Sequence, residues 1–157
     1  MAEPASGGHL DSLSVAEVYV FEARLEQHRG RPLGEPVTRT LALSTDKALV
    51  ALHRLIRQAF EWDDGHLYSF WLDGRYWGSQ EREYTAPFEP EERGASSAEV
   101  RIDRLGLKLG QRIAYVYDFG DEWRVALTLR ESRQGGKTGI LDRHGEAPPQ
   151  YPDWEYG

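Results

Sequence analysis

The chain has 157 residues, with 19 Lys and Arg against 26 Asp and Glu, so its formal net charge is −7 and its isoelectric point is about 5.2. Folding at this length buries roughly two-thirds of the chain's surface, which is enough for one domain with its own core. The sequence has no cysteine, which excludes disulfides, thiolate nucleophiles and Cys-ligated metal centres.

The first ten residues are polar and acidic, without the basic and apolar segments of a secretory signal. No apolar run approaches the roughly 20 residues that cross a bilayer. We therefore expect a cytoplasmic protein that makes no membrane contact. The negative net charge disfavours nucleic-acid binding, which depends on clustered Lys and Arg, although it leaves room for a local basic patch.

The N-terminal third predicts a leader followed by two strands. Residues 1–14 are small, polar and Gly-containing, which predicts a disordered leader before a single domain at 15–157. Residues 15–25 and 37–43 are rich in β-branched and apolar side chains and predict strands. The segment between them contains two glycines and two prolines and predicts a loop.

Residues 46–60 predict one clear helix. Four apolar side chains recur along it at helical spacing: Leu49, Leu52, Ile56 and Phe60. Ser44 or Thr45 is the expected N-cap, and Asp46 is expected in the first turn, where the helix dipole favours a negative charge. This stripe predicts a helix laid on a sheet.

The remainder of the chain predicts three further strands and one hairpin return. Residues 66–72, 111–118 and 122–130 have strand patterns, and Asp73-Gly74 is a preferred hairpin pair, with 75–78 as the expected returning strand. Residues 79–98 predict a long loop and 102–109 a short helical turn. From Ser132 onward the chain is Gly- and Pro-rich and predicts no regular structure.

These elements together predict an α+β fold. One main helix packs on a mostly antiparallel, twisted sheet of about five to six strands, in the order β-β-α-β-β-loop-β-β.

The 117–123 turn reads Tyr-Asp-Phe-Gly-Asp-Glu-Trp. Asp118 and Asp121 bracket a glycine that can supply the positive φ of a tight reversal, and turn carboxylates accept backbone N–H groups. This favours a structural interpretation of the turn. The functional alternative is a carboxylate pair, with Glu122 beside it, that holds a cation or acts as acid and base.

Two histidines are further candidates. His53 lies at the margin of the helical stripe, and His66 opens the strand after the helix. Neighbouring in space, they could ligate a metal or transfer protons. The alternative is that each imidazole satisfies a backbone group at the end of an element. No HExxH motif, phosphate-binding glycine loop or nucleophile elbow occurs, so we expect no metal, no cofactor and no assigned catalytic residue.

Aromatic side chains are the main candidates for partner binding, since such residues dominate protein interfaces. The expected binding residues lie near turns and element ends: Trp62, Tyr68, Tyr76, Trp77 and Trp123. Further aromatics flank segments expected to be flexible: Tyr84, Phe88, Tyr151, Trp154 and Tyr156.

Several of these motifs together resemble one known family. They are Leu52-His53 on the helix, Phe60-x-Trp62, His66-Leu67-x-x-Phe70, and Tyr-x-Tyr-Asp-Phe-Gly-Asp-x-Trp at 115–123. This combination is similar to the plasmid ORF-3-like family, named for an open reading frame on an Ri plasmid and also described as passenger proteins of insertion elements. The resemblance covers roughly residues 15–155. It implies a small α+β fold and a bacterial, often mobile-element, setting, and it implies no activity.

The chain departs from the family pattern at three places. Members often carry histidines where this chain has Tyr68 and Val125, and many carry an acidic-Cys-Gly-Gly stretch where residues 145–149 read Gly-Glu-Ala-Pro-Pro. If those residues build a site in relatives, half of it is lost here, which weakens a metal or enzyme function.

Three functions remain open. The first is a non-enzymatic module that binds a protein partner or its own copy. The second is a metal- or carboxylate-dependent enzyme using His53, His66, Asp118 and Asp121. The third is a nucleic-acid-associated role in a mobile element, which requires a basic stripe from five arginines: Arg54, Arg57, Arg101, Arg104 and Arg112.

Overall fold

The computed structural model describes residues 17–87 and 94–151, in which nine strands form one sheet. The strands are β1 (Glu17–His28), β2 (Arg31–Pro32), β3 (Thr38–Ser44), β4 (Tyr68–Trp71), β5 (Glu83–Thr85), β6 (Ser96–Ser97), β7 (Arg112–Tyr117), β8 (Trp123–Gln134) and β9 (Gly139–His144). Their order is β6-β5-β4-β7-β8-β1-β3-β9, and β2 pairs with β1. All pairings are antiparallel except that of β5 with β6.

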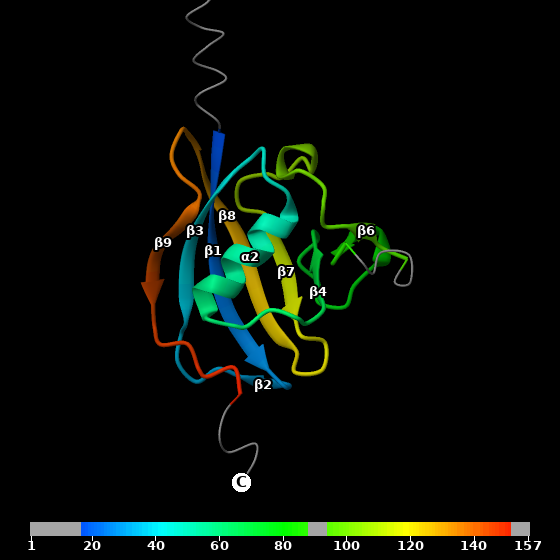
Figure 1. The fold of residues 1–157 in the computed structure, drawn as a ribbon, viewed down its shortest axis with the longest axis vertical. Helices are drawn as coiled ribbons and strands as arrows, with labels where there is room; N and C mark the ends of the chain where they lie inside the picture. The colour runs from blue at the N-terminus through cyan, green and yellow to red at the C-terminus, as the bar shows by residue number, and fades with distance from the viewer. Residues whose placement is uncertain (1–16, 88–93, 152–157) are drawn as a thin grey trace, which may run out of the picture.

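The helix α2 (Leu49–Phe60) crosses one face of this sheet, in front of its central strands in Figure 1. Two 3-10 turns complete the described elements, η1 (Gln80–Arg82) and η2 (Ile102–Arg104). No helix within residues 17–87 and 94–151 combines the length and apolarity needed to cross a bilayer.

The expected α+β domain with five to six strands is wrong, because the described chain is mostly sheet, with nine strands and one α-helix. The predicted strands correspond to β1, β3, β4, β7 and β8. Those that were missed are either two or three residues long or, in β9, lack apolar alternation. The expected return at 75–78 is not a strand, since β4 pairs instead with β5.

The helix begins three residues later than expected, and no side chain caps it. Ala48 is the N-cap residue. The first free N–H groups are satisfied by backbone carbonyls, with Leu49 donating to Val100 at 3.1 Å and Val50 donating to Ala98 at 2.9 Å. Backbone carbonyls of a neighbouring loop therefore replace the side-chain cap that was expected from Ser44 or Thr45. Ser44 Oγ instead donates to Asp46.

The main core lies between α2 and the sheet. The apolar stripe of the helix is buried there, together with the inward side chains of β1, β3, β7 and β8. Alternation along the strands places other residues on the opposite face of the sheet. There Trp71, Ala114 and Val116 form a second cluster, against which Tyr76 and Phe119 pack. The sheet is therefore covered by the helix on one face and partly by the 73–79 loop on the other.

Several sequence expectations fall on residues without a described position. The leader at 1–14 and the aromatics Phe88, Trp154 and Tyr156 lie outside the described residues.

Candidate functional site

The 117–123 turn is held by its own aspartate. Asp118 has a φ of 62° and Glu122 a φ of 53°, both in the left-handed region. Asp118 tolerates this conformation because its Oδ1 accepts the N–H groups of Gly120 and Asp121, each at 3.2 Å. Gly120 was expected to supply the positive φ, but it has none. The turn therefore depends on a carboxylate more than on its glycine.

The other carboxylate oxygen of Asp118 faces His66. Its Oδ2 lies 3.4 Å from His66 Nδ1. His66 Nε2 lies 2.9 Å from the hydroxyl of Tyr151 and 3.7 Å from Asp63 Oδ1. Tyr117 donates its hydroxyl to the backbone carbonyl of Asp63, which ties this group to β7. An imidazole between a carboxylate and a hydroxyl can hold a defined tautomer and move a proton.

Asp121 lies on the other side of the turn and joins it to the end of β1. Its Oδ1 accepts from Arg29 Nη2 at 2.8 Å and from Arg29 Nε at 3.0 Å. His28 Nε2 is 3.7 Å from Asp121 Oδ2, and the His28 ring stacks on Trp123 at 3.7 Å between centroids. Glu122 pairs locally, accepting from Arg124 Nε at 2.6 Å. Asp121 therefore connects the turn to a strand that is distant in sequence, whereas Glu122 does not.

His53 belongs to a different environment from the turn. It is 5% exposed, its Nδ1 lies 2.8 Å from the hydroxyl of Tyr115, and its ring stacks on Tyr68 at 3.6 Å. Burial lowers the pKa of His53 from 6.5 to about 3, so its imidazole is neutral at pH 7. Burial also raises the pKa of Tyr68 to about 12.

Among the described residues, no hydrogen bond joins the imidazole of His53 to that of His66. Both rings contact Tyr117, at 5.7 Å and 5.6 Å between centroids, so an aromatic ring is a shared neighbour of the two imidazoles. Among residues 17–87 and 94–151, no group of three or more His, Asp or Glu side chains is arranged to hold a metal ion.

Most of the expected binding aromatics are core residues. Trp62 is 3% exposed, Tyr68 is 4% exposed and Trp123 is fully buried. Trp62 stacks on Tyr117 and packs against Trp123, so the family motif forms one aromatic cluster inside the fold. Such side chains position the turn and are shielded from a partner.

Tyr76 and Trp77 lie on the face of the sheet opposite α2. Trp77 is 38% exposed, and its ring packs against Trp71 at 5.2 Å and Phe119 at 5.0 Å between centroids. Tyr76 is half-buried, donates its hydroxyl to Glu26 at 2.8 Å and lies under the guanidinium of Arg124. Tyr76, Trp77 and Phe119 form what we term the aromatic patch.

The five arginines of the expected basic stripe do not share one face. Arg54 and Arg57 lie on α2, whereas Arg112 lies on the opposite face of the sheet and pairs with Glu26 at 2.9 Å. Arg101 pairs with Asp103 at 2.6 Å. These pairs reduce the positive charge available to a phosphate backbone.

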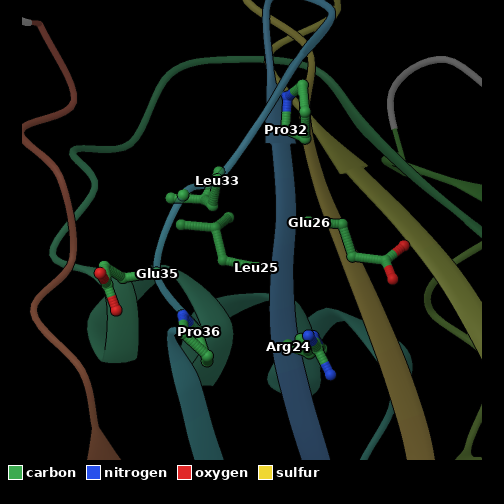
Figure 2. Close-up of a pocket in the computed structure, with 8 residues that line it drawn as sticks. Arg24, Leu25, Glu26, Pro32, Leu33, Glu35 and Pro36 are labelled. Atoms are coloured by element: carbon green, nitrogen blue, oxygen red, sulfur yellow. The ribbon is translucent and has the colours of Figure 1, made fainter.

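A cavity of about 250 Å³ lies between β1 and the segment before β3. Figure 2 shows Leu25 and Leu33 side by side in it, while Glu26 leaves β1 on the other side. Glu26 is already bonded to Tyr76 and Arg112. None of the expected site residues lines this cavity, which therefore offers no link to the 117–123 turn.

Arg29 and His28, which contact Asp121, and Asp63, which contacts Tyr117, were not expected at the site, and Tyr151 was named only as an aromatic beside a flexible segment. Arg29 and Asp121 are 92 positions apart, and Tyr151 and Asp63 are 88 apart. No local pattern marks such pairs, since their proximity results from strand order alone.

The comparisons with known proteins agree with this fold. A family model described as plasmid pRiA4b ORF-3-like protein matches residues 18–150. The structure is similar to that of a protein of unknown function, MM3350, from Methanosarcina mazei Go1, with a TM-score of 0.70 and 20% sequence identity over 90% of this chain and 78% of the other. At that identity the likeness shows a shared fold alone. No curated protein matches the sequence.

Proposed function

The chain belongs to the plasmid pRiA4b ORF-3-like family, and we propose that it acts as a non-enzymatic module that binds a partner protein through its aromatic patch. The observation that carries this proposal is the exposure of Trp77. It is 38% exposed, whereas Trp62, Trp71 and Trp123 are between 0% and 3% exposed.

The patch is ordered before any partner arrives. The Trp77 ring contacts Trp71, which is fully buried, and Phe119 of the 117–123 turn. Its backbone φ of 57° lies in a region that costs a non-Gly residue energy. A side chain already fixed by its neighbours loses little conformational entropy on binding, which is what a tryptophan at the centre of an interface requires.

Charged groups surround this patch as they surround many interfaces. Glu26 pairs with Arg112 and Glu22 pairs with Arg130, at 2.9 Å each, on the same face of the sheet. A central aromatic with a polar rim is the usual anatomy of a protein–protein contact. The candidate carboxylates Asp121 and Glu122 are meanwhile engaged in internal ion pairs, which favours binding over acid–base chemistry at the turn.

The proposal is tested by isolating partners from a bacterial lysate on immobilised wild-type protein and on Trp77→Ser. Leu141→Ser is the matched control, because Leu141 is 46% exposed on β9, at the other end of the sheet. Each retained protein is then purified and its Kd measured. Loss of a central tryptophan should weaken binding by at least about tenfold, and the control should bind as wild type. Equal affinity for Trp77→Ser and wild type would refute the patch.

The second candidate function is enzymatic and is favoured by the geometry at His66. Its imidazole lies between Asp118 at Nδ1 and Tyr151 at Nε2, which suits a general base oriented by a carboxylate. It predicts turnover of at least one substrate from a hydrolase panel that His66→Ala abolishes and Trp77→Ser preserves. Absence of turnover, or turnover unaffected by His66→Ala, would reject it.

A further inference from the structure

A cavity of about 180 Å³ lies between α2 and β4, on the helix-covered face of the sheet, away from the aromatic patch. It is lined by Val50, His53, Arg54, Asp64, Tyr68 and Pro87. We infer that it binds a small zwitterion of the α-amino-acid class, whose carboxylate faces Arg54, His53 and Tyr68 and whose ammonium faces Asp64.

The first support is a buried imidazole with one nitrogen left over. His53 is 95% buried, since it is 5% exposed, and its Nδ1 is bonded to the hydroxyl of Tyr115. No residue in the described ranges bonds to Nε2, so the ring edge that carries Nε2 is the one left for the cavity. The fully buried side-chain atoms that lack a partner in the described ranges lie elsewhere, so Nε2 is reached through the cavity and can bond to a ligand there.

The hydrogen bond of Tyr115 decides whether His53 Nε2 carries a proton. The Tyr115 hydroxyl is fully buried, and His53 is its one hydrogen-bond partner within residues 17–87 and 94–151. A buried O–H needs an acceptor, so Tyr115 donates to Nδ1 and the neutral imidazole keeps its proton on Nε2. The low pKa of His53 keeps it in this neutral form at pH 7. His53 therefore presents an N–H donor to the cavity.

Tyr68 adds a second polar group beside the first. Its ring stacks on that of His53 at 3.6 Å between centroids, and the hydrogen bond that Tyr68 accepts from Thr85 Oγ1 is at its backbone carbonyl, not at its hydroxyl. The two groups are held face to face by strand β4 and helix α2. An N–H and an O–H fixed side by side suit the two oxygens of a carboxylate.

The rim of the cavity carries one charge of each sign, and these charges are not paired with one another. Within the described part of the chain, the ion pair made from this stretch of α2 belongs to Arg57 and not to Arg54. Asp64 Oδ1 accepts from the Gly65 N–H at 2.9 Å and lies 4.0 Å from Arg57, which leaves Oδ2 available. A separated cation and anion match a ligand that carries both signs.

The cavity volume limits the ligand's size. At about 180 Å³ it is smaller than the roughly 300–1,000 Å³ of pockets for drug-sized ligands, which restricts it to a small molecule such as alanine. The side chains of Val50 and Pro87 supply an apolar wall for its methyl group.

The test is an NMR titration of the ¹⁵N-labelled full chain with L-alanine, and with propanoate and ethylamine as probes that lack one charge. L-alanine should shift the amides of His53, Asp64 and Tyr68 with a millimolar Kd, and propanoate and ethylamine should each bind about tenfold more weakly. Equal binding of propanoate and L-alanine would overturn the zwitterion assignment. No shift at about 50 mM L-alanine would overturn the site itself.

Variants at the rim keep the proposal independent of folding defects, because Arg54 and Asp64 are exposed. Arg54→Gln and Asp64→Asn should each lower the affinity for L-alanine about tenfold, and Tyr68→Phe, which keeps the stacked ring, about fivefold. Arg104→Gln is the matched control for charge and should bind as wild type. Wild-type affinity in both Arg54→Gln and Asp64→Asn would contradict the proposal, and Trp77→Ser should leave L-alanine binding unchanged.

Discussion

Replacing Asp121 by alanine tests whether the 117–123 turn is a structural junction. The change removes the carboxylate that accepts from Arg29 Nη2 at 2.8 Å and from Arg29 Nε at 3.0 Å. It leaves the backbone hydrogen bond from Arg29 N–H to the Asp121 carbonyl, at 2.9 Å. The variant therefore isolates the side chain's contribution to holding β1 against the turn.

The size of the effect follows from how far each partner is exposed. The Asp121 side chain is 12% exposed, whereas that of Arg29 is 47% exposed. Hydrogen bonds to charged groups contribute about 1.5–3 kcal/mol each when buried, but both bonds here share one oxygen and solvent screens the arginine. We therefore expect Asp121→Ala to lower the free energy of unfolding by about 2 kcal/mol.

Urea denaturation followed by tryptophan fluorescence measures this change. Glu131→Ala is the matched control, because the Glu131–Arg133 pair has a similar contact distance of 2.8 Å but side chains that are 46% and 50% exposed. We expect the control to cost about 0.5 kcal/mol or less. If Asp121→Ala lowers the free energy of unfolding no more than Glu131→Ala does, the turn does not depend on this ion pair and is not a structural junction.

Three further predictions follow from the fold. Burial lowers the pKa of His53 from 6.5 to about 3, so its contribution to stability is complete above pH 6.5 and falls by about 1.4 kcal/mol per pH unit below it. His53→Gln should therefore flatten the pH dependence of the unfolding free energy between pH 7 and pH 4, and an unchanged slope would refute the burial of a neutral imidazole. Tyr115→Phe should cost about 1–2 kcal/mol in urea denaturation by leaving His53 Nδ1 without its partner, and a neutral substitution would contradict that bond. Gly145 has a φ of 81°, and an added Cβ would overlap the Pro36 carbonyl, so Gly145→Ala should lower the melting temperature. Gly139 has open space around it, so Gly139→Ala should be tolerated, and equal effects of the two variants would rule out this close approach.

The elements with local sequence signals could be predicted, and those that depend on distant partners could not. The stripe from Leu49 to Phe60 predicts α2 because helical spacing is a local property. β9 reads Gly-Ile-Leu-Asp-Arg-His and is bulged near Leu141, where its register against β3 shifts. It is a strand because β3 lies beside it, and β3 lies about 100 residues earlier in the chain. Its sequence alone does not alternate, so it predicts a tail.

The candidate site shows the same division. The sequence singled out His66 and Asp118, whose side chains lie 3.4 Å apart. It carried no signal for Arg29 or for the contact of Tyr151 with His66, because the contacts of these residues with Asp121 and His66 span 92 and 85 positions. It also pointed to Trp123 as a binding residue, which is fully buried. The residue type alone does not distinguish an aromatic side chain in the core from one in an exposed binding patch, since both are large and apolar.

We propose that this domain binds a partner through Trp77, while His66 and the carboxylates of the 117–123 turn maintain the fold. The most direct test compares the Kd of one purified partner for wild type, Trp77→Ser and His66→Ala. We expect Trp77→Ser to weaken binding by at least about tenfold, and His66→Ala to lower stability without changing the Kd. Unchanged binding by Trp77→Ser, together with loss of binding by His66→Ala, would contradict the account.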